Sequence, residues 1–140
     1  HSSLGLTAVR IFTCLATLSP MMGGTLFVAG SHRLVQKLVG EDERLASHDA
    51  RKRLISAHPW VKALCSRGEA ENRVQRFMVE GTVIDGVEVR VVEMTGEPGD
   101  VILAHPTILH APALNCSSSP RFALSTTAFR SDVEPVKLYP

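Results

Sequence analysis

The sequence has few cysteines and no long hydrophobic run, the features that form disulfide frameworks, structural zinc sites and membrane-spanning helices. Its three cysteines lie far apart, are odd in number and form no C-x-x-C pair. This pattern argues against a disulfide scaffold or a zinc site and favours reduced, inert thiols, so we expect a cytoplasmic protein. No apolar run approaches the roughly 18 residues of a transmembrane helix, so we expect no membrane-spanning segment.

The chain also lacks an excess of charge of either sign. It has 15 Lys and Arg residues against 14 Asp and Glu residues, a formal net charge of +1. This balance provides no electrostatic reason to expect nucleic acid or an anionic membrane as a partner. The only basic run, residues 51–53, is typical of a solvated helix face; the alternative interpretation is a contact with an anionic substrate.

The first third of the chain alternates between strand and helix signals. Residues 9–18 and 25–29 are predicted strands, and the short Pro/Gly turn between them favours antiparallel pairing. Ser31 is well placed to cap a short helix that runs to Val39 and is closed by Gly40.

The middle of the chain is charged and then returns to strand patterning. Residues 41–78 carry apolar residues at helical intervals, which predicts two or three short helices broken at Pro59 and near Gly68. Residues 82–91 alternate as in a strand hairpin, with Asp85-Gly86 as its two-residue turn.

The sequence of residues 99–130 predicts two strands joined by a polar turn. This β-hairpin would carry positively charged side chains at one end. The first strand, followed by a His-Pro bend, leads to His110, and the second opens on Arg121. An imidazole can ligate a metal and a guanidinium can hold a carboxylate, so these two residues form a site hypothesis.

The order of these elements predicts a mainly β fold with a helical insertion. Strands, then helices, then strands again fit an antiparallel β-sandwich with the helices held to one side. The 140 residues suffice for one domain with a core of its own, so we expect a single domain over residues 1–140.

Two stretches resemble the phytanoyl-CoA dioxygenase-like group of iron(II)/2-oxoglutarate oxygenases. Residues 108–112 (ILHAP), Asn115 and residues 121–124 (RFAL) are similar to its LLHGSGPN-like turn and R-apolar-AL strand. Residues 24–33 (GTLFVAGSHR) are similar to its G-x-L-x-V-x-PGSH stretch. The resemblance implies a double-stranded β-helix, or jelly roll, with a metal at one open end and residues 41–78 covering it.

The resemblance also implies roles for the two candidate site residues. His110 would be the second His of a 2-His-1-carboxylate iron(II) site, and Arg121 would bind the far carboxylate of the cosubstrate 2-oxoglutarate. The implied activity is oxidation of a small organic substrate by O₂. From the residues alone, His110 could instead fill a turn and Arg121 could form a surface salt bridge.

The first half of the iron site is missing from the sequence. None of the six histidines is followed two positions later by a carboxylate, whereas the family has His-x-Asp or His-x-Glu before its first matching strand. We expect the pair to precede His1, which follows no initiator Met, so that this chain is incomplete and nearly inactive. The alternatives are a protein that has lost iron, or His1 as a ligand with Ser3 in place of the carboxylate.

Other interpretations remain open. A metal-free jelly-roll binding protein and a cupin-type epimerase would use the same barrel without 2-oxoglutarate. His105 is either a structural residue or a partner that orients ligands, and His32 is expected to fix the corner between strand and helix. Phe12 is expected in the core or beside 2-oxoglutarate. The sequence favours neither hydroxylation nor halogenation and no particular oligomeric state.

Overall fold

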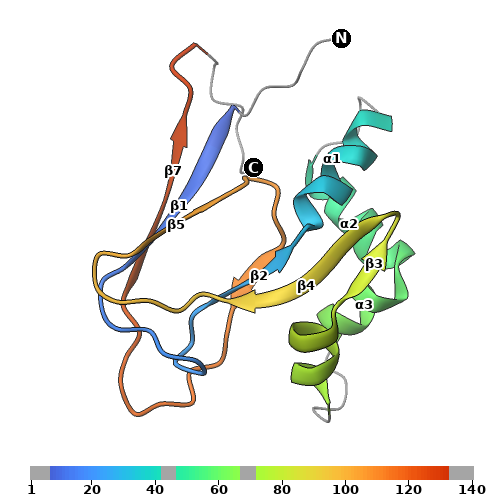
Figure 1. The fold of residues 1–140 in the computed structure, drawn as a ribbon. Helices are drawn as coiled ribbons and strands as arrows, with labels where there is room; N and C mark the ends of the chain where they lie inside the picture. Colours follow the sequence, from blue (N-terminus) through green and yellow to red (C-terminus); the bar gives the residue numbers. More distant parts are fainter. Residues whose placement is uncertain (1–6, 42–46, 67–71, 133–140) are drawn as a thin grey trace.

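The computed structural model describes residues 7–41, 47–66 and 72–132 as two antiparallel sheets with helices beside one of them (Figure 1). The three-stranded sheet has the order β5-β1-β7, formed by Val101–Ala104, Ala8–Cys14 and Ala123–Phe129. The four-stranded sheet has the order β3-β4-β2-β6, formed by Thr82–Ile84, Val87–Glu93, Thr25–Ala29 and His110–Pro112. The expected mainly β fold is therefore confirmed, while the finer assignment to a double-stranded β-helix stays a prediction.

Helices cover the face of the four-stranded sheet that points away from the other sheet (Figure 1). They are α1 (Ser31–Glu41), α2 (Ser47–Ala57), α3 (Pro59–Cys65) and the π-helix η1 (Gln75–Glu80). The break between α2 and α3 comes at Pro59, as expected, because proline is tolerated only in the first turn of a helix. No helix in the described part of the chain is long and apolar enough to cross a membrane.

Alternation along the strands of the four-stranded sheet produces two separate cores. Val28 faces the helices, and Phe27 beside it faces the three-stranded sheet. The helix-side core also holds buried residues of α1 to α3 and β4, namely Leu34, Val35, Leu54, Val61, Val89 and Val91. The core between the sheets is smaller and consists of Phe12, Cys14, Leu18, Phe27, Met94 and Ala104.

The predicted hairpin at Asp85-Gly86 is confirmed. It joins β3 and β4, which pair antiparallel, and its two turn residues have φ angles of 48° and 79°. Positive φ at both central positions is the requirement of a type I′ turn, for which Asp-Gly is among the favoured pairs.

Both predicted pairings of sequential strands elsewhere are wrong. β1 and β2 lie in different sheets, and Phe12 and Phe27 meet edge to face across the core with ring centroids 5.0 Å apart. β5 and β7 both pair with β1, on its two sides, and β6 between them in sequence pairs with β2. The chain crosses between sheets because this buries apolar faces on both, which local turn signals do not encode.

The corner after β2 also differs from expectation. Ser31 does not cap α1; it is the first helical residue, and its buried hydroxyl accepts a hydrogen bond of 2.9 Å from the backbone N–H of Leu109. Gly40 does not close the helix, which continues to Glu41. Gly30, with φ of +84°, makes the turn from strand to helix.

Candidate functional site

His110 begins β6 and faces the space between the two sheets. It pairs with Phe27 of β2, and its ring centroid lies 5.8 Å from that of Phe12 and 6.3 Å from that of Phe27. The preceding residue, Leu109, packs against the helix-side core instead. The alternation of β6 therefore directs this half-buried imidazole toward β1.

Hydrogen bonding fixes the orientation of the His110 ring. Its Nδ1 lies 3.0 Å from the carbonyl oxygen of Ile108 and must donate to it, which leaves Nε2 as the acceptor nitrogen. Nε2 lies 3.4 Å from Nη1 of Arg10. Burial, and then the charges of Arg10 and Arg51, lower the pKa of His110 against the opposing effect of the Ile108 bond, so the neutral form is favoured.

Two arginines from different elements approach His110. Arg10 lies on β1, two residues before the buried Phe12 and on the same face of the strand. Arg51 lies on α2 and donates through Nη2 to the carbonyl oxygen of Pro106, at 3.4 Å. Sequence analysis did not single out Arg10, although a charged residue on the inward face of a buried strand is a signal that could have found it.

The expectation that residues 51–53 form a solvated helix face does not hold for Arg51. It is half-buried, whereas Lys52 and Arg53 beside it are exposed. A helix turns about 100° per residue, so Arg51 lies about 60° around the helix from the buried Leu54 and borders its packed side.

Arg121 lies apart from these groups. It precedes β7, is exposed, and donates through Nη1 to the carbonyl oxygen of Gly23, at 2.7 Å. Polar bonds within residues 115–119 shape the turn before it, where the Asn115 carboxamide accepts from the Ser117 N–H and donates to the Ser119 carbonyl. Among the described residues, no hydrogen bond or ion pair joins Arg121 to His110.

The described residues do not form an iron site by themselves. In residues 7–41, 47–66 and 72–132, no three His, Cys, Asp or Glu side chains come together as a metal-binding group. His110 contributes one imidazole, and the Arg10 guanidinium lies where the lone pair of Nε2 points. A second cation would be repelled there. His1 and Ser3, the third interpretation of the missing motif, lie outside the described residues.

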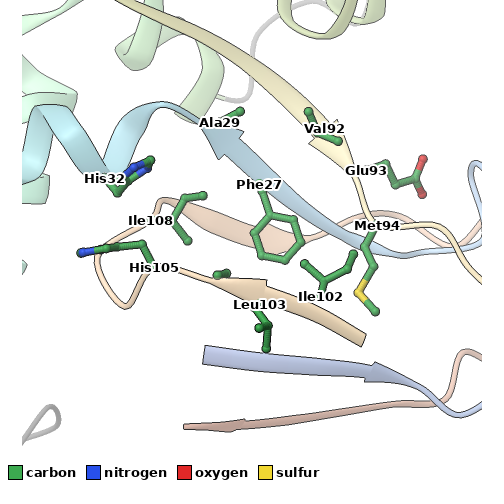
Figure 2. A pocket seen from close by; sticks show the side chains of 11 residues that line it. Phe27, Ala29, His32, Val92, Glu93, Met94, Ile102, Leu103, His105 and Ile108 are labelled. Carbon is green, nitrogen blue, oxygen red and sulfur yellow. The ribbon is translucent and has the colours of Figure 1, made fainter. Parts of the chain in front are cut away.

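A hollow of about 390 Å³ lies beside Phe27, and His110 is not among its lining residues (Figure 2). Apolar side chains of β2 and β5 line most of it, with Met94 and Ile102 at one end and His32 and His105 at the other. Phe27 lines the hollow and its ring also lies beside the His110 ring, so it borders both.

His32 and His105 stack on each other, with ring centroids 5.2 Å apart and planes 27° apart. Nδ1 of His105 accepts a hydrogen bond from the Thr107 N–H and lies 2.8 Å from the Thr107 hydroxyl. Burial lowers the pKa of each imidazole; the charge of Arg33 adds to this for His32, and the charge that His32 would carry when protonated adds to it for His105. The corner role expected of His32 belongs to Ser31, and His32 instead lines the hollow.

Comparison with known proteins identifies one family. The sequence model described as Phytanoyl-CoA dioxygenase (PhyH) matches residues 5–123, which include both stretches whose resemblance was noted, save the last residue of the second strand motif. No curated protein and no solved structure matches the chain.

Proposed function

Because this chain belongs to the phytanoyl-CoA dioxygenase family, we propose that it is the larger part of an iron(II)/2-oxoglutarate-dependent oxygenase acting on a small organic substrate. The family is one of oxygenases, which supports the reaction class. The observation that carries the proposal beyond the family match is the position of His110, held at the start of β6 with its acceptor nitrogen directed between the sheets.

His110 is the proposed iron ligand. The bond from its Nδ1 to the Ile108 carbonyl fixes both the tautomer and the ring orientation, as the outer hydrogen bonds of metal-bound histidines usually do. A lowered pKa keeps the imidazole neutral, which is the ligating form. When bound, iron(II) would supply the chemistry that activates O₂. The Arg10 guanidinium has to move from Nε2 before a metal can bind.

Arg121 is the proposed binding residue for the distal carboxylate of 2-oxoglutarate. A guanidinium has five N–H donors in a planar fork that matches a carboxylate. The bond from Nη1 to the Gly23 carbonyl orients this fork, and the remaining donors can serve a ligand.

The remaining iron ligands have to come from outside the described residues. By resemblance to the family, they are a His and a carboxylate in a His-x-Asp or His-x-Glu pair before β1. The double-stranded β-helix is part of the same proposal, since two facing antiparallel sheets with His110 between them are the arrangement it requires.

The test is an anaerobic titration with iron(II) and 2-oxoglutarate, monitored by the visible charge-transfer band of the chelate. It uses this chain and the chain extended upstream to include the expected pair. We expect a band in the extended protein that is lost in His110→Ala and Arg121→Ala and retained in His48→Ala and Arg90→Ala, whose side chains are exposed elsewhere. No band in either protein would overturn the proposal and favour a metal-free binding protein.

A further inference from the structure

The Arg10 guanidinium beside Nε2 of His110 is unsuited to a metal cation but well suited to an anion. Nη1 of Arg10 is 3.4 Å from Nε2, so a divalent cation at Nε2 would be close to a positive charge. The same positive charge attracts a negatively charged ligand. The Arg10 guanidinium, which would repel an iron ion at Nε2, therefore favours an anion as the ligand at this position.

Arg51 contributes a second guanidinium from a different element. It comes from α2, is half-buried, and is tied to the chain just before β6 by its bond to the Pro106 carbonyl. Arg10 contacts the His110 imidazole directly, and Arg51 is bonded to the loop that leads into His110, so both cations lie near the start of β6. The Nε atoms of both side chains are inaccessible to solvent.

Partial burial increases the strength of such a site. Charge-assisted bonds from a guanidinium to an oxyanion are about twice as strong as neutral hydrogen bonds, and lower local polarity strengthens them further. The planar fork of arginine matches the geometry of a carboxylate or phosphate, and guanidinium is weakly hydrated and tolerates burial. Both arginines also have other interaction partners, and an anion would add to these or replace one.

We propose that Arg10 and Arg51 bind a small oxyanion, a carboxylate or a phosphate group, next to His110 between β1, β6 and α2. This site needs no metal and is separate from Arg121, whose guanidinium is bound to the Gly23 carbonyl. It therefore goes beyond the proposed oxygenase activity.

The test is calorimetric titration of the metal-free chain, in the presence of a chelator, with succinate and with inorganic phosphate. We expect at least one of the two to bind, with the affinity reduced about tenfold or more in Arg10→Gln and in Arg51→Gln, because each loses a charge-assisted bond. Arg53→Gln, on the exposed side of α2, is the matched control and should change the affinity less than about twofold.

A second measurement does not depend on any variant folding. In the NMR spectrum of the unmodified chain, the ring signals of His110 should shift on addition of the anion that binds, while those of the exposed His48 should not. Absence of binding by both anions, or a loss of binding in Arg121→Gln but not in Arg10→Gln, would overturn the proposal. Failure of the iron titration would leave this result unaffected, so the two proposals fail separately.

Discussion

Three neighbouring residues around the start of β6 have three different environments. Ile108 packs with the core between the sheets, Leu109 packs with the helix-side core, and His110 contacts Arg10 and the two core phenylalanines. A single residue of insertion or deletion here would exchange the environments of Leu109 and His110. The position of the candidate site thus depends on strand register.

Gly30 is a position where no other residue should be accommodated. Its φ is +84°, and a Cβ atom there would lie 2.2 Å from the Glu88 carbonyl oxygen. We expect Gly30→Ala to cost at least about 1 kcal/mol more in unfolding free energy than Gly86→Ala, which shares a positive φ (+79°) but meets no atom within 4 Å. Urea denaturation of both variants checks this. Equal losses of unfolding free energy in the two variants would mean that the positive φ alone, and not the close approach of the Glu88 carbonyl, makes glycine necessary at position 30.

Phe27 has a structural role in the core between the two sheets. Because it is 6% exposed and in edge contact with Phe12, we expect Phe27→Ala to lower the unfolding free energy by about 3–5 kcal/mol. Phe122→Ala, at a side chain that is 57% exposed, should change it by less than about 0.5 kcal/mol. Thermal and urea denaturation measure both, and similar values for the two would contradict the assignment of Phe27 to the core.

At the scale of elements, turn chemistry explains the β3–β4 hairpin better than ion pairing does. Asp85 is 3.8 Å from the Lys37 ammonium, but both side chains are half-exposed, so this pair contributes little. Its φ of 48° is a conformation that Asn and Asp tolerate and most residues do not.

We therefore expect Asp85→Asn to change the unfolding free energy by less than about 0.5 kcal/mol, since it removes only the ion pair. Asp85→Ala should cost about 1 kcal/mol, because it adds backbone strain. Equilibrium denaturation of the two variants at moderate salt is the measurement. A large loss in Asp85→Asn would show that the ion pair with Lys37 matters more than the turn.

Elements far apart in sequence meet at the candidate site. Arg10 comes from β1, Arg51 from α2 and His110 from β6, and only the crossing of the chain between sheets brings them together. The described helices of the 41–78 insertion, α2, α3 and η1, pack on the outer face of the four-stranded sheet, and Arg51 of α2 bonds to the loop before β6. Its role as a cover over the site stays a prediction.

For the whole molecule, two half-buried histidines should make stability depend on pH. The pKa values of His32 and His105 are lowered in the folded protein, for which burial is the main cause, while in the unfolded chain they return to about 6.5. As the pH falls through 6.5 and toward the folded values, the unfolded state binds more protons, and stability is lost. Above this window the dependence should vanish.

Urea denaturation at pH 7.5 and 5.5 measures this effect. We expect lower stability at pH 5.5, with a smaller difference between the two values in the double variant His32→Gln, His105→Gln than in the unmodified protein. The variant His48→Gln, at an exposed position, should behave as the unmodified protein does. Greater stability at pH 5.5 than at 7.5 would contradict the lowered pKa values of these two half-buried imidazoles.

The sequence by itself determined the local elements and the family. Period-two alternation and turn residues identified β2, the β3–β4 hairpin and the helix break at Pro59, because these depend on interactions between near neighbours. The motifs around His110 and Arg121 indicated the family whose model matches residues 5–123. Their roles in binding iron and 2-oxoglutarate stay predictions.

Tertiary structure alone decided which strands pair and which side chains meet. The expected hairpins of β1 with β2 and of β5 with β7 followed local turn rules, but the chain crosses between sheets because that buries Phe12 against Phe27 and both faces of β2. Arg10 and Arg51 reach His110 only through this crossing. Burial of apolar surface depends on residues distant in sequence. It therefore determined the strand pairing and the side-chain contacts that local sequence patterns could not determine.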